Sequence, residues 1–264
     1  MLAQQLTEKW QQAGITDGDC VLLHSSVSRT MRLARKDDET FTLTDLLQTF
    51  INAVGDEGTL LLPLFNFDFC NGVPFDIRST PSTMGAITEV ARTDSRFQRT
   101  RHPMYSFAVC GRLASAFTSL SNISALSDDG PFGLLRRSDG KVAVLDIDDQ
   151  NSMTIYHHIE EVVGVDYRYH KSFIGDYIDE NGEVATRSFE LFVWDESKGI
   201  RTDVNRAGEL LWDKGLYSGF RPGVGSGLRV IRAQKMFDAI ERVIASGMAR
   251  DYLYSVETGN NSHE

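Results

Sequence analysis

A buried strand that runs directly into a helix is the feature that most constrains this chain. Residues 141–147 are mostly β-branched or apolar and follow an Asp-Gly turn, a pattern typical of a buried strand. Asn151 or Ser152 is then a candidate N-cap, and apolar residues recur at helical spacing over 155–163. This strand–turn–helix unit predicts an α/β fold, in which ligands bind beyond the carboxyl ends of the strands.

The first turns of that helix carry side chains suited to acid–base chemistry. Thr154 and His157 are three residues apart, as are His157 and Glu160, so each pair can meet on one face of the helix. An imidazole beside hydroxyl and carboxylate groups is a candidate general base. The alternative interpretation is a solvated helix end with an incidental pair of histidines, and the spacing alone does not separate the two.

Strands and helices alternate along the rest of the chain. The hydrophobic patterns predict helices at 2–13, 44–54, 83–92, 114–120, 203–214 and 233–246, and strands at 20–23, 59–64, 105–109, 172–178, 184–193 and 228–231. Asn181-Gly182 indicates a β-hairpin, and 66–82 is predicted to be a long functional or lid-like loop. We therefore predict one α/β domain over 1–264, three-layered α/β/α, with a mixed central sheet, an inserted β-hairpin and a disordered tail at 258–264.

The composition excludes several classes of function. The chain has 27 basic and 37 acidic side chains and a net charge of −10, which argues against a nucleic-acid partner and fits a cationic substrate. No apolar run approaches the ~20 residues of a membrane-spanning helix, and residues 1–12 lack an apolar signal core. The three cysteines are widely separated, as expected of reduced thiols. We expect a cytoplasmic protein with no membrane partner.

A hydroxyl-rich segment follows the first predicted strand. His24, Ser25, Ser26 and Ser28 lie where that strand ends, and a loop with free hydroxyls and backbone N–H groups can hold phosphates or an amide-bearing cofactor arm. The alternative is a turn whose hydroxyls satisfy their own backbone.

Two other motifs resemble known ligand-binding patterns, but neither fits its pattern. The glycines of 223–227 precede a predicted strand instead of opening a helix, so a dinucleotide-binding loop is rejected. His157 and His158 lie near Glu160 and Glu161, but adjacent histidines point about 100° apart on a helix, and the spacing is not that of a zinc helix. We expect no metal.

Several segments, taken in order, resemble the aminoglycoside 3-N-acetyltransferase family, antibiotic N-acetyltransferases that do not have the GNAT fold. The segments are VLLHSSVS at 21–28, AVGDEGTLLLP at 53–63, HPMYSFAVCG at 102–111, GPFGLL at 130–135, GKVAVL at 140–145, TIYHHIE at 154–160 and VGSG at 224–227. They cover nearly the whole chain, from about residue 5 to 245.

The resemblance implies an acetyl-coenzyme A-dependent N-acyltransferase with an α/β/α fold and a small-molecule amine as substrate. By position, His157 would be the general base, the Ser25-Ser26 loop with His102 and Ser106 would line the coenzyme A site, and Asn205 would stand where the family has an assisting carboxylate. Asn205 is a departure, because an amide cannot stabilise imidazolium by charge. Glu160 and Asp203 are the alternative carboxylates.

A second departure is Leu64 after Pro63, where the family has threonine. The two departures bear on the aminoglycoside substrate more than on acyl transfer, since relatives of this type also acylate amino sugars and aminophosphonates. A homodimer is one assembly compatible with the resemblance.

The chemistry expected at this site is deprotonation of an amine. An alkylamine with a pKa of ~10 must lose a proton before it attacks a thioester, and His157 would take that proton. Thr154 is a candidate donor to the thioester carbonyl, and Asp68, Glu160 and Glu161 would attract the cationic substrate. We expect direct transfer without an acyl-cysteine.

Two rival functions stay open. One is a thioester hydrolase with Ser25 or Ser26 as nucleophile, although no G-x-S-x-G elbow is present. The other is a non-catalytic coenzyme A-binding relative, suggested by Asn205 and Leu64.

Overall fold

The protein has a seven-stranded sheet at its centre, and the computed structural model describes residues 2–256. The predicted tail at 258–264 lies outside these described residues. The strands follow the order β10-β11-β6-β1-β2-β5-β4. Their bounds are β1 (Cys20–Ser25), β2 (Thr59–Pro63), β4 (Gln98–Arg99), β5 (Phe107–Gly111), β6 (Lys141–Leu145), β10 (Ser218–Gly219) and β11 (Leu228–Arg232). The central strands β6, β1 and β2 run parallel, whereas β11 and β5 join them antiparallel, so the sheet is mixed, as predicted.

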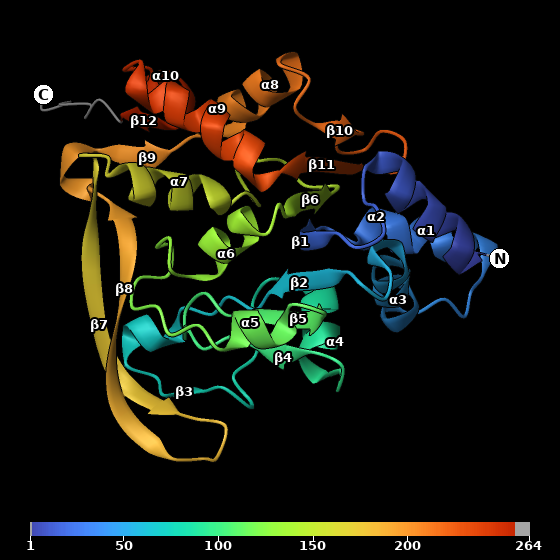
Figure 1. Ribbon diagram of the computed structural model, residues 1–264, viewed down its shortest axis with the longest axis horizontal. Coiled ribbons are helices and arrows are strands. Elements are labelled where there is room, and N and C mark those ends of the chain that lie inside the picture. The colour runs from blue at the N-terminus through green and yellow to red at the C-terminus, as the bar shows by residue number, and fades with distance from the viewer. Residues whose placement is uncertain (1, 257–264) are drawn as a thin grey trace, which may run out of the picture.

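Helices cover both faces of this sheet (Figure 1). One face carries α1 (Leu2–Ala13), α2 (Ser28–Asp37), α3 (Leu43–Val54) and α4 (Ala86–Thr93). The other carries α5 (Ala114–Thr118), α6 (Pro131–Arg137), α7 (Ile155–Val163), α8 (Asn205–Asp213), α9 (Ala233–Ala245) and α10 (Ala249–Tyr252). Alternate residues of β1 point to opposite faces, with Val21 and Leu23 in one core and Leu22 in the other. The three-layer α/β/α prediction is confirmed.

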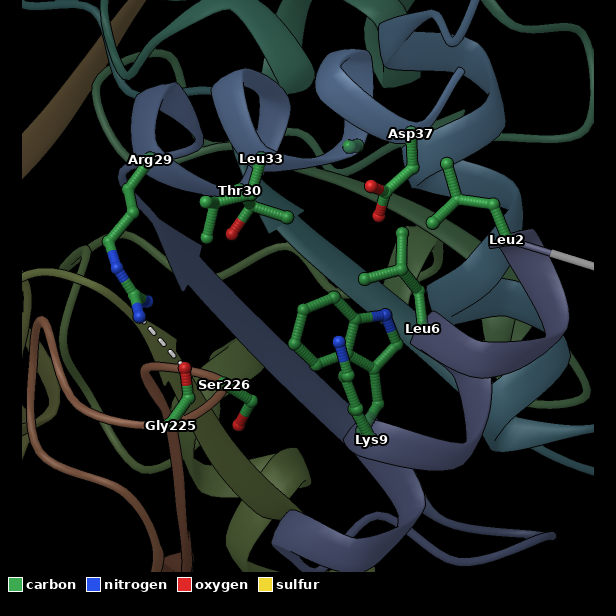
Figure 2. A pocket seen from close by; sticks show the side chains of 11 residues that line it. Leu2, Leu6, Lys9, Arg29, Thr30, Leu33, Asp37, Gly225 and Ser226 are labelled. Carbon is green, nitrogen blue, oxygen red and sulfur yellow. Dashed lines mark hydrogen bonds between the residues drawn. The ribbon is translucent and has the colours of Figure 1, made fainter.

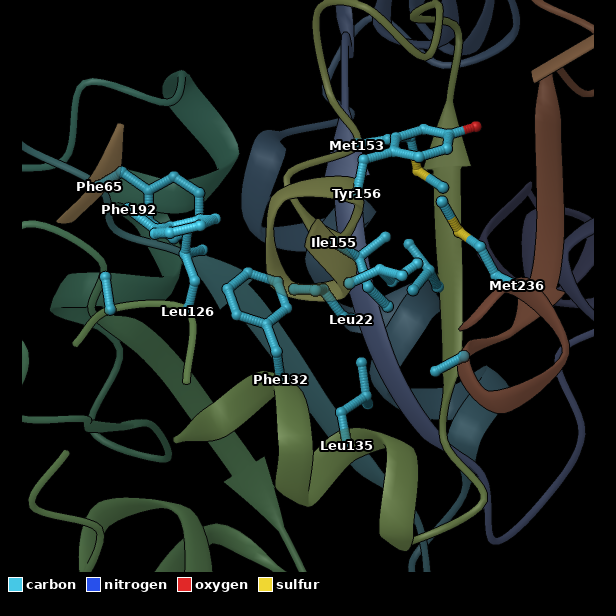
Figure 3. Packing of buried hydrophobic residues seen from close by; sticks show 14 of the residues in the cluster. Leu22, Phe65, Leu126, Phe132, Leu135, Met153, Ile155, Tyr156, Phe192 and Met236 are labelled. Carbon is cyan, nitrogen blue, oxygen red and sulfur yellow. The ribbon is translucent and has the colours of Figure 1, made fainter. Parts of the chain in front are cut away.

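The core beneath α7 fixes the position of that helix. Figure 3 shows Ile155 and Tyr156 of α7 packed with Leu22 of β1, Phe132 of α6 and Met236 of α9. All five side chains are buried. Because interiors are close-packed, such a contact set leaves α7 little freedom to rotate, and the side chains on its other face are held in fixed directions.

A long hairpin stands beside the main sheet (Figure 1). It consists of β7 (Arg168–Ile178) and β8 (Val184–Trp194), joined across the predicted Asn-Gly turn, and β3 (Phe75–Asp76) adds a third strand to it. A separate pair is formed by β9 (Ile200–Thr202) and β12 (Tyr254–Val256), and a 3-10 turn, η2 (Glu196–Lys198), lies between β8 and β9. The inserted hairpin is confirmed.

The structure contains helices that the hydrophobic pattern did not reveal, among them α2, α6 and the short α10. α2 is strongly basic and buries only a narrow stripe of Thr30, Met31 and Ala34, too little to give a clear helical period. α6 begins with Pro131, which suits a first helical position, but contains Gly133, whose absent side chain lets the helix approach the Asp128 carbonyl.

Two further expectations need correction. α7 begins at Ile155 with Thr154 as its N-cap residue, so neither Asn151 nor Ser152 caps it. The segment 66–82 is less irregular than predicted, because it contains a 3-10 turn, η1 (Asp68–Asn71), and β3, which pairs with β7. Phe69 and Phe75 are buried in the core there, which anchors this segment.

Candidate active site

The loop between β6 and α7 is anchored by one buried carboxylate. The backbone oxygen of Asp149 accepts hydrogen bonds from Ser152 and Met153. Its side chain accepts one from the Tyr156 hydroxyl at 2.7 Å. The first turn of α7 is thereby tied to the carboxyl end of β6, the edge where ligands bind in open α/β sheets.

His157 and His158 point to different surroundings, as the helical geometry predicts. His158 is fully buried, and its Nδ1 lies 2.6 Å from the Leu126 carbonyl. The ring of His158 stacks on Phe132, and burial lowers its pKa to about 4. The His157 side chain retains 19% of its surface exposed. Of these two rings, His157 is therefore the one that a ligand can reach.

His157 is paired with Glu160 one turn further along α7. Nδ1 of His157 lies 2.9 Å from Oε2 of Glu160, a carboxylate that is only 1% exposed. The other carboxylate oxygen, Oε1, accepts a hydrogen bond from the Tyr167 hydroxyl at 2.9 Å. The expected histidine–carboxylate contact at spacing three is present.

A buried arginine completes this cluster. Arg168, the first residue of β7, places Nε 2.7 Å from Oε2 of Glu160 and Nη2 2.8 Å from Nδ1 of His157. Burial first, and then the charge of Arg168, lower the pKa of His157, while Glu160 acts in the opposite direction. The net shift favours a neutral imidazole near pH 7, the state in which a histidine can accept a proton.

Asn205 does not stand where the resemblance placed it. Its Oδ1 accepts a hydrogen bond from the backbone of Gln150 at 2.9 Å, and its amide lies 3.4 Å from Asp148. The carboxylate that contacts the imidazole of His157 is Glu160. The alternative carboxylate Asp203 instead pairs with Arg206 at 3.1 Å.

Three other candidate residues, Thr154, Glu161 and Asp68, differ in their surroundings. Thr154 is partly exposed, and no side-chain cap bond is formed by its hydroxyl within the described chain. Oε2 of Glu161 accepts a hydrogen bond from the Ser124 hydroxyl at 2.9 Å, and Oε1 lies 3.2 Å from Nε2 of His170. Asp68 is exposed at the start of η1.

The hydroxyl-rich segment lies at the carboxyl end of β1, as predicted. Ser26 N donates to the Leu145 carbonyl at 2.8 Å, and Ser28 is exposed as the first residue of α2. The buried hydroxyl of Ser25 lacks a hydrogen-bond partner among residues 2–256. His24 is buried beneath the segment, and burial lowers its pKa to about 4.

The structure gives His102 and Ser106 partners inside the protein. Nδ1 of His102 accepts a hydrogen bond from Tyr105 N at 3.2 Å, and its ring meets Phe189 edge-on. The Ser106 hydroxyl accepts from Arg99 at 3.0 Å and contacts the Leu64 carbonyl at 3.3 Å. Both side chains are buried, and Nε2 of His102 has no hydrogen-bond partner among residues 2–256.

A small hollow lies on the other side of α2, away from α7. Figure 2 shows Arg29 and Leu33 of α2 facing Leu6 of α1 across it, with Gly225 accepting a hydrogen bond from Arg29. The hollow has a volume of about 60 Å³, and His157 and Glu160 are not among the residues that line it.

The remaining observations concern metals, thiols and membranes. Residues 2–256 contain no group of three or more histidine, cysteine or acidic side chains that could hold a metal ion. Cys20, Cys70 and Cys110 are all free thiols. No helix within the described part of the chain combines the length and apolar character that crossing a membrane requires.

Sequence reasoning missed two important members of the cluster, Tyr167 and Arg168. Both are buried, although Arg168 opens a strand whose next residues are mostly exposed and Tyr167 lies in the turn just before it. The sequence around Arg168 does not distinguish it from a solvent-exposed arginine. Its role depends on contacts with α7, which precedes it in the chain.

Comparisons with known proteins agree on one family. The family described as aminoglycoside 3-N-acetyltransferase matches residues 22–245. A curated relative, the SPbeta prophage-derived aminoglycoside N(3')-acetyltransferase-like protein YokD of Bacillus subtilis (strain 168), is 26% identical over 180 residues. That match covers 60% of this chain and 64% of the relative's own length.

Solved structures share the fold. AAC-IIIb, described as a binary complex with CoASH, is 18% identical, with a TM-score of 0.78, covering 93% of this chain and 96% of that one. AAC-VIa bound to sisomicin is 19% identical, with a TM-score of 0.75, covering 93% and 97%. At these identities the likeness establishes the architecture, and the chemistry of this chain has to be argued from its own residues.

Proposed function

Because this chain belongs to the aminoglycoside 3-N-acetyltransferase family, we propose that it is an acetyl-coenzyme A-dependent N-acyltransferase. Its acceptor is a primary amine of an aminoglycoside or a related amino sugar. The observation that carries the proposal is the partly exposed His157, whose Nδ1 faces the buried Glu160 at 2.9 Å. The relatives seen with CoASH and with sisomicin support this pair of substrates.

His157 is the proposed general base. An alkylamine with a pKa of ~10 is protonated near neutrality and cannot attack a thioester in that form. With Nδ1 directed at Glu160, Nε2 is the ring nitrogen left to take a proton from the amine, directly or through water. The Glu160 carboxylate stabilises the imidazolium formed in that step, as an amide such as Asn205 could not.

Thr154 is the proposed donor to the thioester carbonyl. It directly precedes α7, and its backbone oxygen accepts a hydrogen bond from His157 N at 3.0 Å, so the two residues lie one turn apart. Its partly exposed hydroxyl makes no cap bond within residues 2–256. A free donor beside the base can hydrogen-bond to the oxygen on which negative charge develops.

The segment from His24 to Ser28 is the proposed coenzyme A contact. Acetyl-coenzyme A supplies the acetyl group as a thioester. The fit rests on the unpaired, buried Ser25 hydroxyl among the described residues and on the start of α2 at Ser28, where the first N–H groups of a helix lack intrahelical partners. Such a terminus suits the phosphates or amides of the cofactor arm.

Acidic side chains are proposed to attract a cationic acceptor. Asp68 is exposed, whereas the Glu161 side chain is only 7% exposed and is held by Ser124 and His170, so Asp68 is the better placed of the two. The chain has a net charge of −10, which favours the approach of a polycation. Glu160 itself is occupied by Arg168 and His157, so in this proposal it assists the base.

Transfer is proposed to be direct, without an acyl-cysteine. Burial raises the pKa of Cys20 to about 12 and of Cys110 to about 11, and it also raises the pKa of Cys70. The thiolate is the nucleophilic form of cysteine. All three side chains are therefore poor candidates for a covalent intermediate.

Two observations weaken the case for the two rival functions. No hydrogen bond joins Ser25 or Ser26 to a histidine among residues 2–256, as a serine hydrolase would require. The non-catalytic alternative rested partly on Asn205, whereas the structure supplies a carboxylate to His157 from Glu160.

A thiol-release assay tests the proposal. Acetyl-coenzyme A is offered with sisomicin, glucosamine, 2-aminoethylphosphonate or no amine. We expect release that depends on an amino-sugar acceptor, and a His157→Gln variant that keeps its melting temperature and coenzyme A affinity but loses turnover. Release without any amine would favour the hydrolase. Coenzyme A binding without turnover on any amine would favour the non-catalytic relative.

A further inference from the structure

Arg168 is a buried cation that contacts both members of the His157–Glu160 pair. Its side chain is 3% exposed. Nε lies 2.7 Å from Glu160 as an ion pair, and Nη1 donates to the Phe192 carbonyl of β8 at 3.0 Å. Nη2 reaches Nδ1 of His157 at 2.8 Å and Oγ1 of Thr202, in β9, at 3.1 Å.

These contacts place two incompatible demands on Nδ1 of His157. A guanidinium can only donate hydrogen bonds, so Arg168 requires a lone pair on Nδ1, whereas Glu160 requires a proton there. One nitrogen cannot satisfy both at once. If Nδ1 accepts from Arg168, the proton of the neutral ring sits on Nε2, which then cannot act as a base.

The hydroxyl of Thr202 is an alternative hydrogen-bond acceptor for Arg168. Nη2 can donate to the Thr202 hydroxyl at 3.1 Å instead of to the ring, and Nδ1–H is then free to donate to Glu160 at 2.9 Å. In this arrangement Nε2 keeps its lone pair. The cation remains close to the ring and opposes a second proton.

We propose that Arg168 is a positioning residue that keeps His157 neutral, and that Thr202 and the Phe192 carbonyl hold its guanidinium so that Nδ1–H of His157 stays directed at Glu160. Its catalytic meaning rests on the proposed function, but the position of the proton is a property of the free protein. The charged groups within residues 2–256 that contact the ring are Glu160 on its own helix and Arg168 from β7. From β9, Thr202 contributes an uncharged hydroxyl, and Tyr167 acts on the ring through Glu160.

The test is a ¹⁵N NMR titration of the His157 ring in the full chain, with His157→Gln used to assign the signals. In the wild type we expect protonated Nδ1 and unprotonated Nε2 near pH 7, with a titration midpoint below ~6.5. Arg168→Met removes the cation and should raise the midpoint by about one pH unit or more. Arg168→Lys is the matched control, because it keeps a charge and should leave the midpoint closer to that of the wild type.

Thr202→Val tests the tautomer separately and leaves every charge in place. Without its hydroxyl acceptor, Nη2 turns to Nδ1, so we expect the ring signals to change toward the Nε2–H form. The inference is overturned if the wild type already has Nε2–H, or if Arg168→Met leaves the midpoint unchanged. The inference is also overturned if the His157 ring stays in the Nδ1–H form in Thr202→Val. This variant supplies the test if Arg168→Met does not fold.

Kinetics separate this inference from the proposed function. If both hold, the acid limb of kcat/KM for acetyl transfer moves upward in Arg168→Met in parallel with the NMR midpoint. If no amine is acetylated while the NMR shifts occur as expected, the proposed function fails and the role of Arg168 stands. If acetyl transfer is efficient but its acid limb does not move in Arg168→Met, the role of Arg168 fails alone.

Discussion

The Tyr156 hydroxyl donates to Oδ2 of Asp149 across 2.7 Å, and this bond joins the first turn of α7 to the loop that leaves β6. Tyr217 donates to the same oxygen, also at 2.7 Å, and Arg229 pairs with Oδ1 at 2.7 Å. Tyr156 directly precedes His157. The first turn of α7, from which the proposed base projects, is therefore held in place by a buried carboxylate that contacts Tyr156, Tyr217 and Arg229.

We predict that Asp149→Asn destabilises the fold strongly. The substitution leaves Arg229, which is 1% exposed, without a balancing charge, and removing one member of a buried ion pair costs about 3–5 kcal/mol. Urea denaturation measures the loss. Glu209→Gln is the matched control, since its pair with Arg221 is exposed and should cost at most about 1 kcal/mol. Equal stability of the two variants would contradict the role given to Asp149.

Glu160→Gln should impair turnover more than binding. The variant keeps the shape of the side chain but removes the charge that would stabilise an imidazolium at His157, so we expect kcat to fall by roughly two orders of magnitude or more. Glu160 also pairs with the buried Arg168, so its loss should destabilise the fold as well, and steady-state kinetics with the best amine from the panel are measured below the melting temperature of the variant. Glu57→Gln, at an exposed glutamate, serves as the control. A Glu160→Gln enzyme with near-normal kcat would remove Glu160 from the mechanism.

We predict that acid lowers the free energy of unfolding, because three histidines are buried. Burial lowers the pKa of His24 to about 4, of His102 to about 3 and of His158 to about 4, from about 6.5 in an unfolded chain. Below pH 6.5 the unfolded chain therefore binds more protons than the folded protein, and the free energy of unfolding falls as the pH falls. The slope approaches about 1.4 kcal/mol per pH unit for each histidine.

Urea denaturation between pH 6.5 and 5 checks this slope. His158→Gln removes one of these groups. Because burial also lowers the pKa of His157, four histidines contribute, and the slope should fall by roughly a quarter to a third, whatever the effect on stability at pH 7. A wild-type stability that does not change over this range would show that these histidines do not govern it.

The sequence predicted the central layers well because their signals are local. The strand 141–147 and the helical period after it correspond to β6 and α7, and the Asn-Gly turn lies between β7 and β8. His157 and Glu160 were found together because residues three apart on one helix must be neighbours. These parts of the fold and the site need no knowledge of distant contacts.

The remainder of the site depends on pairs far apart in the chain. Arg168 approaches α7 only because β7 starts beside it, and Thr202 arrives from β9. Asn205 was matched by its place in a family pattern, yet its hydrogen bond goes to Gln150. A pattern read along one chain carries no information on which of several acidic or amide groups reaches a given imidazole.

Ser25→Ala should separate ligand binding from stability. The Ser25 hydroxyl is buried, with no partner among residues 2–256, and an unpaired buried polar group costs about 1–3 kcal/mol. Removing it should therefore leave the free energy of unfolding unchanged or raise it. If the hydroxyl is reserved for coenzyme A, the same variant weakens coenzyme A binding several-fold in isothermal titration calorimetry.

Ser106→Ala, unlike Ser25→Ala, should lower the free energy of unfolding. Its hydroxyl accepts a hydrogen bond from Arg99 and contacts the Leu64 carbonyl, so its loss leaves buried groups unpaired and costs about 1–3 kcal/mol. Ser115→Ala, at an exposed serine of α5, should change neither stability nor affinity. Because the three variants make the same chemical change, their contrast depends only on the hydroxyl's surroundings. Normal coenzyme A affinity in Ser25→Ala would exclude Ser25 from the cofactor site.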